Sequence, residues 1–129
     1  IHIDFKGQDV DTDTTVDVDS EDANTWLAQG MELIKLEKYE EGIRCFNEVI
    51  RFEDVDHYAL CGAWNEKGLA YSRLGKYDDA ISCYDEIIKI DPTYVNAWSN
   101  KANALESINK HEDAKLCFDE VDQLKHKPE

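Results

Sequence analysis

Apolar residues recur every three or four positions through most of the chain after its acidic start, as on the buried face of a helix. The clearest stretch runs over residues 61–94, where one such stripe ends at Leu74 and a second begins at Ala80. Gly75 lies between the stripes, and Pro92 follows the second. Glycine commonly ends a helix, and the residue before a proline avoids the helical conformation. The pattern predicts two short amphipathic helices joined by a tight turn.

The same pattern occurs once before and once after this stretch. The aligned positions are Trp26, Gly30, Tyr39 and Phe46, then Trp64, Gly68, Tyr77 and Tyr84, then Trp98, Ala102, His111 and Phe118. The first set precedes the second by 38 residues, and the third follows it by 34. The difference of four residues is about one helical turn. We therefore expect the first helix of the middle unit to begin a turn early, near His57.

The spacing Trp64-x2-Lys67-Gly68-x2-Tyr71, followed by Ala80-x3-Tyr84 and Pro92, resembles the tetratricopeptide repeat. Lys67 and Tyr84 depart from that signature, which usually has Leu and Phe at these two positions. The resemblance implies an all-α fold, a right-handed superhelical solenoid of antiparallel helix pairs with three hairpins and six helices. The domain would cover 23–129, with repeats over about 23–56, 61–94 and 95–128.

Residues 1–22 have a different composition, with eight acidic residues against the single base Lys6, and they carry −7 of the net charge of −15. Such dense like charge is typical of a solvated arm, and the alternation of Asp with Val or Thr suits extended backbone. We expect an acidic arm that is extended or disordered. Residues 9–13 look like the start of a calcium-binding loop, but Thr14 and Ser20 stand where that loop needs glycine and glutamate.

The net charge and the cysteines limit the classes of partner and the cellular compartment that we expect for this chain. A net charge of −15 repels nucleic acid and anionic membrane surfaces, and it favours basic or neutral protein partners. A merely solvated acidic surface is the simpler explanation of this charge. The cysteines are Cys45, Cys61, Cys83 and Cys117, and no two form a C-x-x-C pair. Their spacing favours reduced thiols in a soluble, cytoplasmic protein and disfavours a zinc site.

The sequence has no glycine-rich phosphate loop, no G-x-S-x-G nucleophile motif and no H-E-x-x-H zinc motif. Its four histidines do not pair in sequence with a nucleophile. We therefore expect no catalytic residues, no metal site and no cofactor, and we do not expect an enzyme.

The resemblance implies that an extended peptide or protein partner binds in a concave groove, which the first helix of each repeat lines. The candidate residues face away from the stripe that contains the aligned tryptophan and glycine. They are Leu27, Met31 and Lys35, then Asn65, Glu66, Leu69 and Arg73, then Asn96, Asn100 and Asn103. Asparagine amides can pair with both backbone groups of a peptide, and the leucine and methionine side chains form an apolar patch. Alternatively, these asparagines are ordinary polar surface residues.

Some tetratricopeptide repeat proteins bind the acidic C-terminal tail of heat-shock chaperones with a clamp of lysines, asparagines and an arginine. Leu27 and Met31 stand where that clamp has Lys and Asn, and Glu66 stands where it has a second Asn. Asn96 and Asn100 replace its remaining Lys and Arg. We expect this chain not to bind such a tail tightly.

Two functional hypotheses remain open at this point. The first is a non-catalytic scaffold or adaptor module that binds a partner of unknown identity in the groove. The second is self-assembly into a homo-oligomer through residues 1–22 or the C-terminal hairpin, because a solenoid needs polar ends and no further helix follows the sixth. The acidic arm could also lie in the groove as a stand-in ligand.

Overall fold

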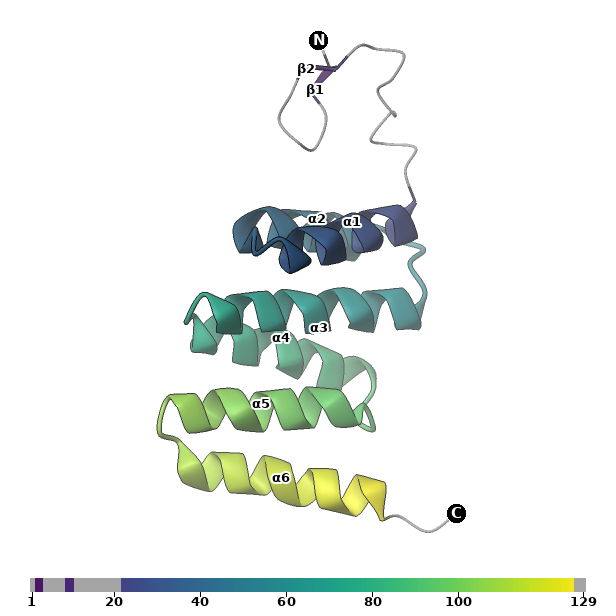
Figure 1. Ribbon diagram of the computed structural model, residues 1–129. Coiled ribbons are helices and arrows are strands. Elements are labelled where there is room, and N and C mark those ends of the chain that lie inside the picture. The colour runs from purple at the N-terminus through teal and green to yellow at the C-terminus, as the bar shows by residue number, and fades with distance from the viewer. Residues whose placement is uncertain (1, 4–8, 11–21, 127–129) are drawn as a thin grey trace.

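The computed structural model describes residues 2–3, 9–10 and 22–126, which form six helices and two short strands (Figure 1). The helices are α1 (Ala23–Lys35), α2 (Tyr39–Arg51), α3 (His57–Arg73), α4 (Tyr77–Ile90), α5 (Val95–Ser107) and α6 (His111–Lys125). They are stacked as three antiparallel pairs from the N-terminal to the C-terminal end of the solenoid. The predicted all-α solenoid of three helical hairpins is therefore confirmed.

Each helix packs on the next one along the chain, and α1 also contacts α3, as α3 contacts α5. The first helices of the three pairs therefore lie side by side and together form one face of the stack. This contact pattern is the one that a groove along α1, α3 and α5 requires.

The four-residue insertion lengthens α3 in the way that the repeat offset predicts. This helix has 17 residues, whereas α1 and α5 have 13 each, and it begins at His57. Asp56 caps it by accepting a hydrogen bond from the Ala59 backbone N–H at 2.7 Å. Asp22 caps α1 in the same way, accepting from Thr25 N–H at 2.8 Å and from the Thr25 hydroxyl at 2.9 Å. These two hydrogen bonds from Thr25 lower the pKa of the Asp22 carboxyl.

Close helix crossings explain the glycines in the middle of α1 and α3. A Cβ atom at Gly30 would lie 2.5 Å from the ring of Phe46, and one at Gly68 would lie 2.5 Å from the ring of Tyr84. Both rings are buried, with 0% and 1% of their surface exposed. In each of these two pairs the aromatic side chain of the second helix fills the space that the missing Cβ leaves.

The third pair breaks this arrangement. Ala102 stands at the glycine position and is fully buried, while Phe118 at the aromatic position is 38% exposed. Phe46 and Tyr84 belong to core clusters that include Ala63 of α3 and Ala97 of α5, whereas among the described helices α6 contacts only α5. The repeat alignment places Phe118 with Phe46 and Tyr84, but the structure leaves it partly exposed.

The turn inside each helix pair has a residue in the left-handed backbone conformation at the same position. Glu37, Gly75 and Asn109 have φ angles of 62°, 77° and 64°. The sequence indicates this turn clearly only at Gly75, because glycine alone adopts the conformation without steric cost. In all three turns the next N–H bonds a carbonyl five residues earlier, as in Lys76 N to Tyr71 O at 2.8 Å, so this hydrogen bond compensates for the strain.

The C-terminal end of the stack is more polar than the internal contacts. Ile81 and Ile88 of α4 are partly buried against the hydrophobic core. At the equivalent positions α6 has Lys115 and Asp122, which are both exposed. Leu116 and Phe118 are the large apolar side chains of this helix that are exposed, at 68% and 38%. Charged side chains thus replace part of the face that would otherwise receive another helix.

Little of the N-terminal arm lies within the described residues. The strands β1 (His2–Ile3) and β2 (Asp9–Val10) pair antiparallel, with His2 opposite Val10. These four residues are extended, and the acidic arm over residues 1–22 stays a prediction. The other residues of the predicted arm before Asp22, including the calcium-loop-like residues 11–14 and 20, lie outside the described part of the chain. Among the described residues, no helix has both the length and the apolar composition needed to cross a bilayer.

Candidate functional site

A cavity of about 180 Å³ lies between α3 and α5, and the start of α4 closes one side of it. The residues that line it are Leu69, Ser72, Arg73, Tyr77, Tyr84, Asn100, Asn103, Ala104 and Ser107. Most of these side chains carry a hydroxyl, amide or guanidinium group, and two of the lining residues are apolar. We call this surface, together with Asn65 and Glu66 beside it, the α3–α5 groove.

A hydrogen bond between two asparagines joins the helices across the groove. The Asn100 Nδ2 atom donates to Asn65 Oδ1 at 2.8 Å, and both side chains are partly buried. Each amide has a second polar atom, and in the described part of the chain neither Asn65 Nδ2 nor Asn100 Oδ1 makes a hydrogen bond. The pair therefore offers one donor and one acceptor from a fixed position, which are the two groups that a peptide unit pairs with.

The floor of the groove includes the hydroxyl end of a core side chain. Tyr84 is held against Gly68 in the core, and its hydroxyl lies 3.5 Å from the Ser72 hydroxyl. Burial raises the pKa of Tyr84, so the hydroxyl remains protonated at neutral pH and can donate or accept a hydrogen bond. The same contact that packs the middle repeat thus sets the depth of the groove.

Glu66 follows Asn65 on α3 and is half-buried. Desolvation raises the pKa of its carboxyl. Among the described residues no lysine, arginine or histidine forms an ion pair with it. The neighbouring Lys67 instead lies over the rings of Trp64 and Tyr71, with its Nζ atom 4.9 and 6.0 Å from their centres.

Of the predicted partner-binding residues, the structure brings Asn65, Leu69, Arg73, Asn100 and Asn103 together at this groove. The residues predicted on the first repeat, Leu27, Met31 and Lys35, do not line the cavity. The Asn96 side chain is exposed in the first turn of α5 and does not line the cavity.

The predicted apolar patch on α1 is smaller than the sequence suggests. Leu27 packs against the core of the first repeat and lies 3.7 Å from the position that a Cβ of Gly62 would take. Met31 is 40% exposed and remains available on the surface. Lys35 is exposed and pairs with Glu32 on its own helix at 4.0 Å, as many surface lysines do.

Tyr77 and Tyr84 line the cavity although the sequence analysis did not select them. Both belong to α4, the second helix of the middle pair, whereas all the predicted residues lie on first helices. A signal for Tyr84 is present in the alignment of repeats, because Phe46 and Phe118 carry no hydroxyl at the equivalent positions. A hydroxyl at a core aromatic position indicates that the end of the side chain reaches a polar surface.

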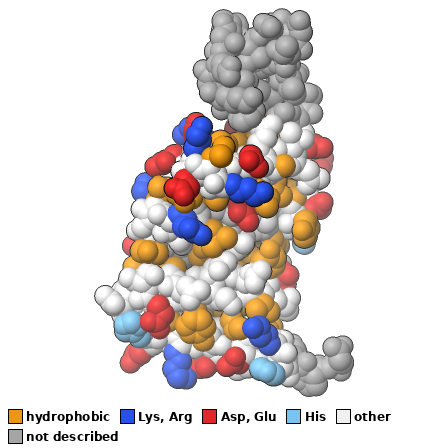
Figure 2. Space-filling view, viewed as in Figure 1, with side chains coloured by type: hydrophobic (Ala, Val, Ile, Leu, Met, Phe, Trp, Pro, Cys, Tyr) orange, Lys and Arg blue, Asp and Glu red, His pale blue; other side chains and the backbone are white. Residues whose placement is uncertain are grey.

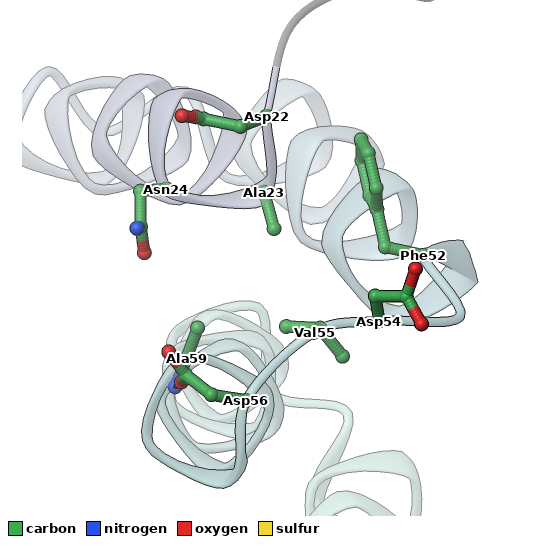
Figure 3. Close-up of a pocket in the computed structure, with 8 residues that line it drawn as sticks. All are labelled: Asp22, Ala23, Asn24, Phe52, Asp54, Val55, Asp56 and Ala59. Atoms are coloured by element: carbon green, nitrogen blue, oxygen red, sulfur yellow. Dashed lines mark hydrogen bonds between the residues drawn. The ribbon is translucent and has the colours of Figure 1, made fainter.

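A second cavity, of about 250 Å³, lies where the inserted residues meet the start of α1 (Figure 3). Ala23, Val55 and Ala59 lie around the gap between α1 and α3, and the rest of the lining is Asp22, Asn24, Phe52, Asp54 and Asp56. Two of its three carboxylates already cap helices, as described above, and the described residues include no cluster suited to a metal ion. This cavity is larger, but two of its carboxylates are already engaged in stabilising helix ends. We therefore favour the α3–α5 groove as the candidate site.

Charge is unevenly distributed on the face of the molecule drawn in Figure 2. On the face drawn in Figure 2, white and orange atoms predominate across the middle, and charged side chains lie mainly above and below that band.

The four cysteine thiols are buried, and burial raises the pKa of Cys83 to about 11. This thiol is therefore protonated at neutral pH and a poor nucleophile.

Comparison with known families gives three matches, and each of them is to a model of the tetratricopeptide repeat. They cover residues 23–54, 62–94 and 83–115. The first two coincide with the repeats predicted from the sequence, and the third begins within α4. None of the curated proteins compared with the chain matches it.

Several solved structures share the fold. The first TPR of Spaghetti (RPAP3), bound to the HSP90 peptide SRMEEVD, is 27% identical with a TM-score of 0.73, and the match covers 84% of this chain and 83% of that one. The second TPR domain of human RPAP3, in complex with the HSP70 peptide SGPTIEEVD, is 23% identical with a TM-score of 0.72, covering 83% and 86%. MamA is 22% identical with a TM-score of 0.75, covering 82% of this chain and 60% of that one.

Proposed function

Because the chain belongs to the tetratricopeptide repeat family, we propose that it is a non-catalytic interaction module that binds an extended peptide in the α3–α5 groove. The observation that carries the proposal is the Asn65–Asn100 pair, which presents one donor and one acceptor beside a cavity. An extended peptide displays backbone N–H and C=O groups along its length, so a fixed amide pair can bind it without reading its sequence. Arg73, Asn103 and the floor hydroxyls would then contact its side chains.

The polar end of the stack supports this function over self-assembly through the C-terminal hairpin. Lys115 and Asp122 occupy the positions through which the isoleucines of α4 reach the next repeat. Lys115 also forms an ion pair with Asp119 on the same face, with 3.0 Å between Nζ and Oδ2. Docking a second copy there would desolvate these charges, which is costly unless the partner neutralises them.

The partner class is expected to differ from that of the RPAP3 domains. Their peptides, SRMEEVD and SGPTIEEVD, both end in acidic residues. In this chain the paired asparagines join α3 and α5 across the groove, the partly buried acid Glu66 follows Asn65, and Arg73 lies about 10 Å farther along α3 than Glu66. We predict that isothermal calorimetry with SRMEEVD detects no binding at micromolar concentration. A micromolar or tighter dissociation constant would contradict this prediction.

The proposal can be tested with a peptide selected on the full chain from a random 12-residue phage library. Replacing both Asn65 and Asn100 by alanine should weaken binding of that peptide by roughly 1–3 kcal/mol, because the peptide backbone loses its partners. Calorimetry measures the change. Gln123→Ala is the matched control, because it removes an exposed amide from α6 and should leave affinity unchanged. Equal affinity of the double variant and the wild type would mean that the asparagines are ordinary surface residues.

A further inference from the structure

Glu66 lies on the part of α3 that runs between the two neighbouring first helices. Gly62, one turn earlier on the same face, lies beside Leu27 of α1, and Asn65 is hydrogen-bonded to Asn100 of α5. The residues one turn away along this face of α3 are Gly62 and Leu69, which carry no charge. The carboxylate is therefore placed among uncharged groups on the groove side of the stack.

The other partly buried charges near the groove are compensated, which makes the position of Glu66 unusual. Lys101 of α5, whose side chain is 23% exposed, pairs with Asp85 of α4, with 2.7 Å between Nζ and Oδ1. Lys67 lies over two aromatic rings. For Glu66, no ion pair exists within the described residues. A partly desolvated carboxylate without a cation costs free energy, and such a cost is often tolerated where a ligand supplies the missing charge.

Glu66 is also specific to the middle repeat. The equivalent positions are Ala28 in the first repeat and Asn100 in the third, so neither the fold nor the repeat pattern requires an acid here. Helix packing gives no reason for it either, because the equivalent α1 and α5 helices form without a carboxylate at this position. The Glu66 carboxylate is therefore not needed for the helices of the solenoid to form and pack.

We propose that Glu66 is the anchor for a lysine or arginine side chain of the bound peptide, so that the partner of this module is a basic segment. This inference rests on the proposed function, since it places the cation in the same groove. The aliphatic stem of such a side chain would lie along Leu69 and its charged head would reach the Glu66 carboxylate. Arginine fits best because its guanidinium can bond both carboxylate oxygens. The net charge of −15 attracts such a segment to the whole molecule, and Glu66 gives it a fixed position.

The test is a double-mutant cycle on the peptide selected from the phage library, measured by calorimetry with the full chain. Selected peptides should be enriched in Lys or Arg relative to the unselected library. Changing that residue of the peptide to glutamine should weaken binding to the wild type by about tenfold or more, as for a charge-assisted hydrogen bond. With Glu66→Gln the same peptide change should have little further effect, because the interaction is already lost.

Glu53→Gln is the matched control, since it removes the same charge from an exposed loop residue. It should preserve the tenfold difference between the two peptides, whereas a purely non-specific attraction would respond equally to both substitutions. Peptides selected without basic residues, or an undiminished difference in Glu66→Gln, would overturn the inference and leave the peptide-binding function intact. Failure to select any binding peptide would contradict the inference and the proposed function together.

Discussion

Replacement of Phe46 by alanine is expected to lower the free energy of unfolding by about 3–5 kcal/mol, the usual cost of removing a buried aromatic side chain. Phe46 has no exposed surface and its ring fills the space above Gly30. Whole domains are stable by only about 5–15 kcal/mol, so this single change would remove a large part of the stability. Urea denaturation followed by circular dichroism measures the loss.

Phe118→Ala provides the matched comparison, because it removes the same side chain from the equivalent position of the third repeat. Phe118 is 38% exposed, and among the described helices α6 contacts only α5, whereas α2 is also covered by α3. We expect a loss of about 1–2 kcal/mol, because less apolar surface returns to water. Equal losses for the two variants would show that the third repeat packs like the first, in conflict with the described structure.

Gly68→Ala is expected to destabilise the protein by about 1–3 kcal/mol, although alanine favours a helix more than glycine does. The added Cβ would lie 2.5 Å from Tyr84, and this ring cannot move outward without leaving a core in which it is 1% exposed. Tyr84 also lines the groove, so its displacement should weaken peptide binding as well.

A second glycine of the same helix distinguishes this clash from a general effect of alanine. A Cβ at Gly62 would meet only Leu27, at an ordinary contact distance of 3.7 Å. Gly62→Ala should therefore stabilise the protein by up to about 1 kcal/mol through helix propensity alone. The two variants should shift the urea midpoint in opposite directions, and a stabilising Gly68→Ala would refute the close crossing of α3 and α4.

The sequence predicts the repeats well because each depends on local spacing. The periodic stripes and the extra helical turn at the start of α3 depend on the chain within one or two turns. The left-handed conformation of Glu37 is not evident from the sequence, because glutamate rarely adopts it, whereas Asn109 is of a residue type that follows helix ends in this conformation more readily. The surrounding turn imposes it on them in the structure.

The groove could be predicted only in part, for a different physical reason. Helical periodicity identifies which side of α3 bears Asn65 and which side of α5 bears Asn100. It does not give the rotation of one repeat against the next, and that rotation decides whether the two amides meet. Tyr84 shows the same limit, because its hydroxyl reaches the groove only through the depth at which its ring packs on Gly68.

The most direct test of the peptide-binding account is amide hydrogen exchange of the full chain with and without the selected peptide. The account predicts slower exchange on binding in α3 and α5, centred on the turns that carry Asn65, Leu69 and Asn100, with smaller changes in α2 and α6. Protection confined to α2, α4 or α6, with α3 and α5 unchanged, would contradict it.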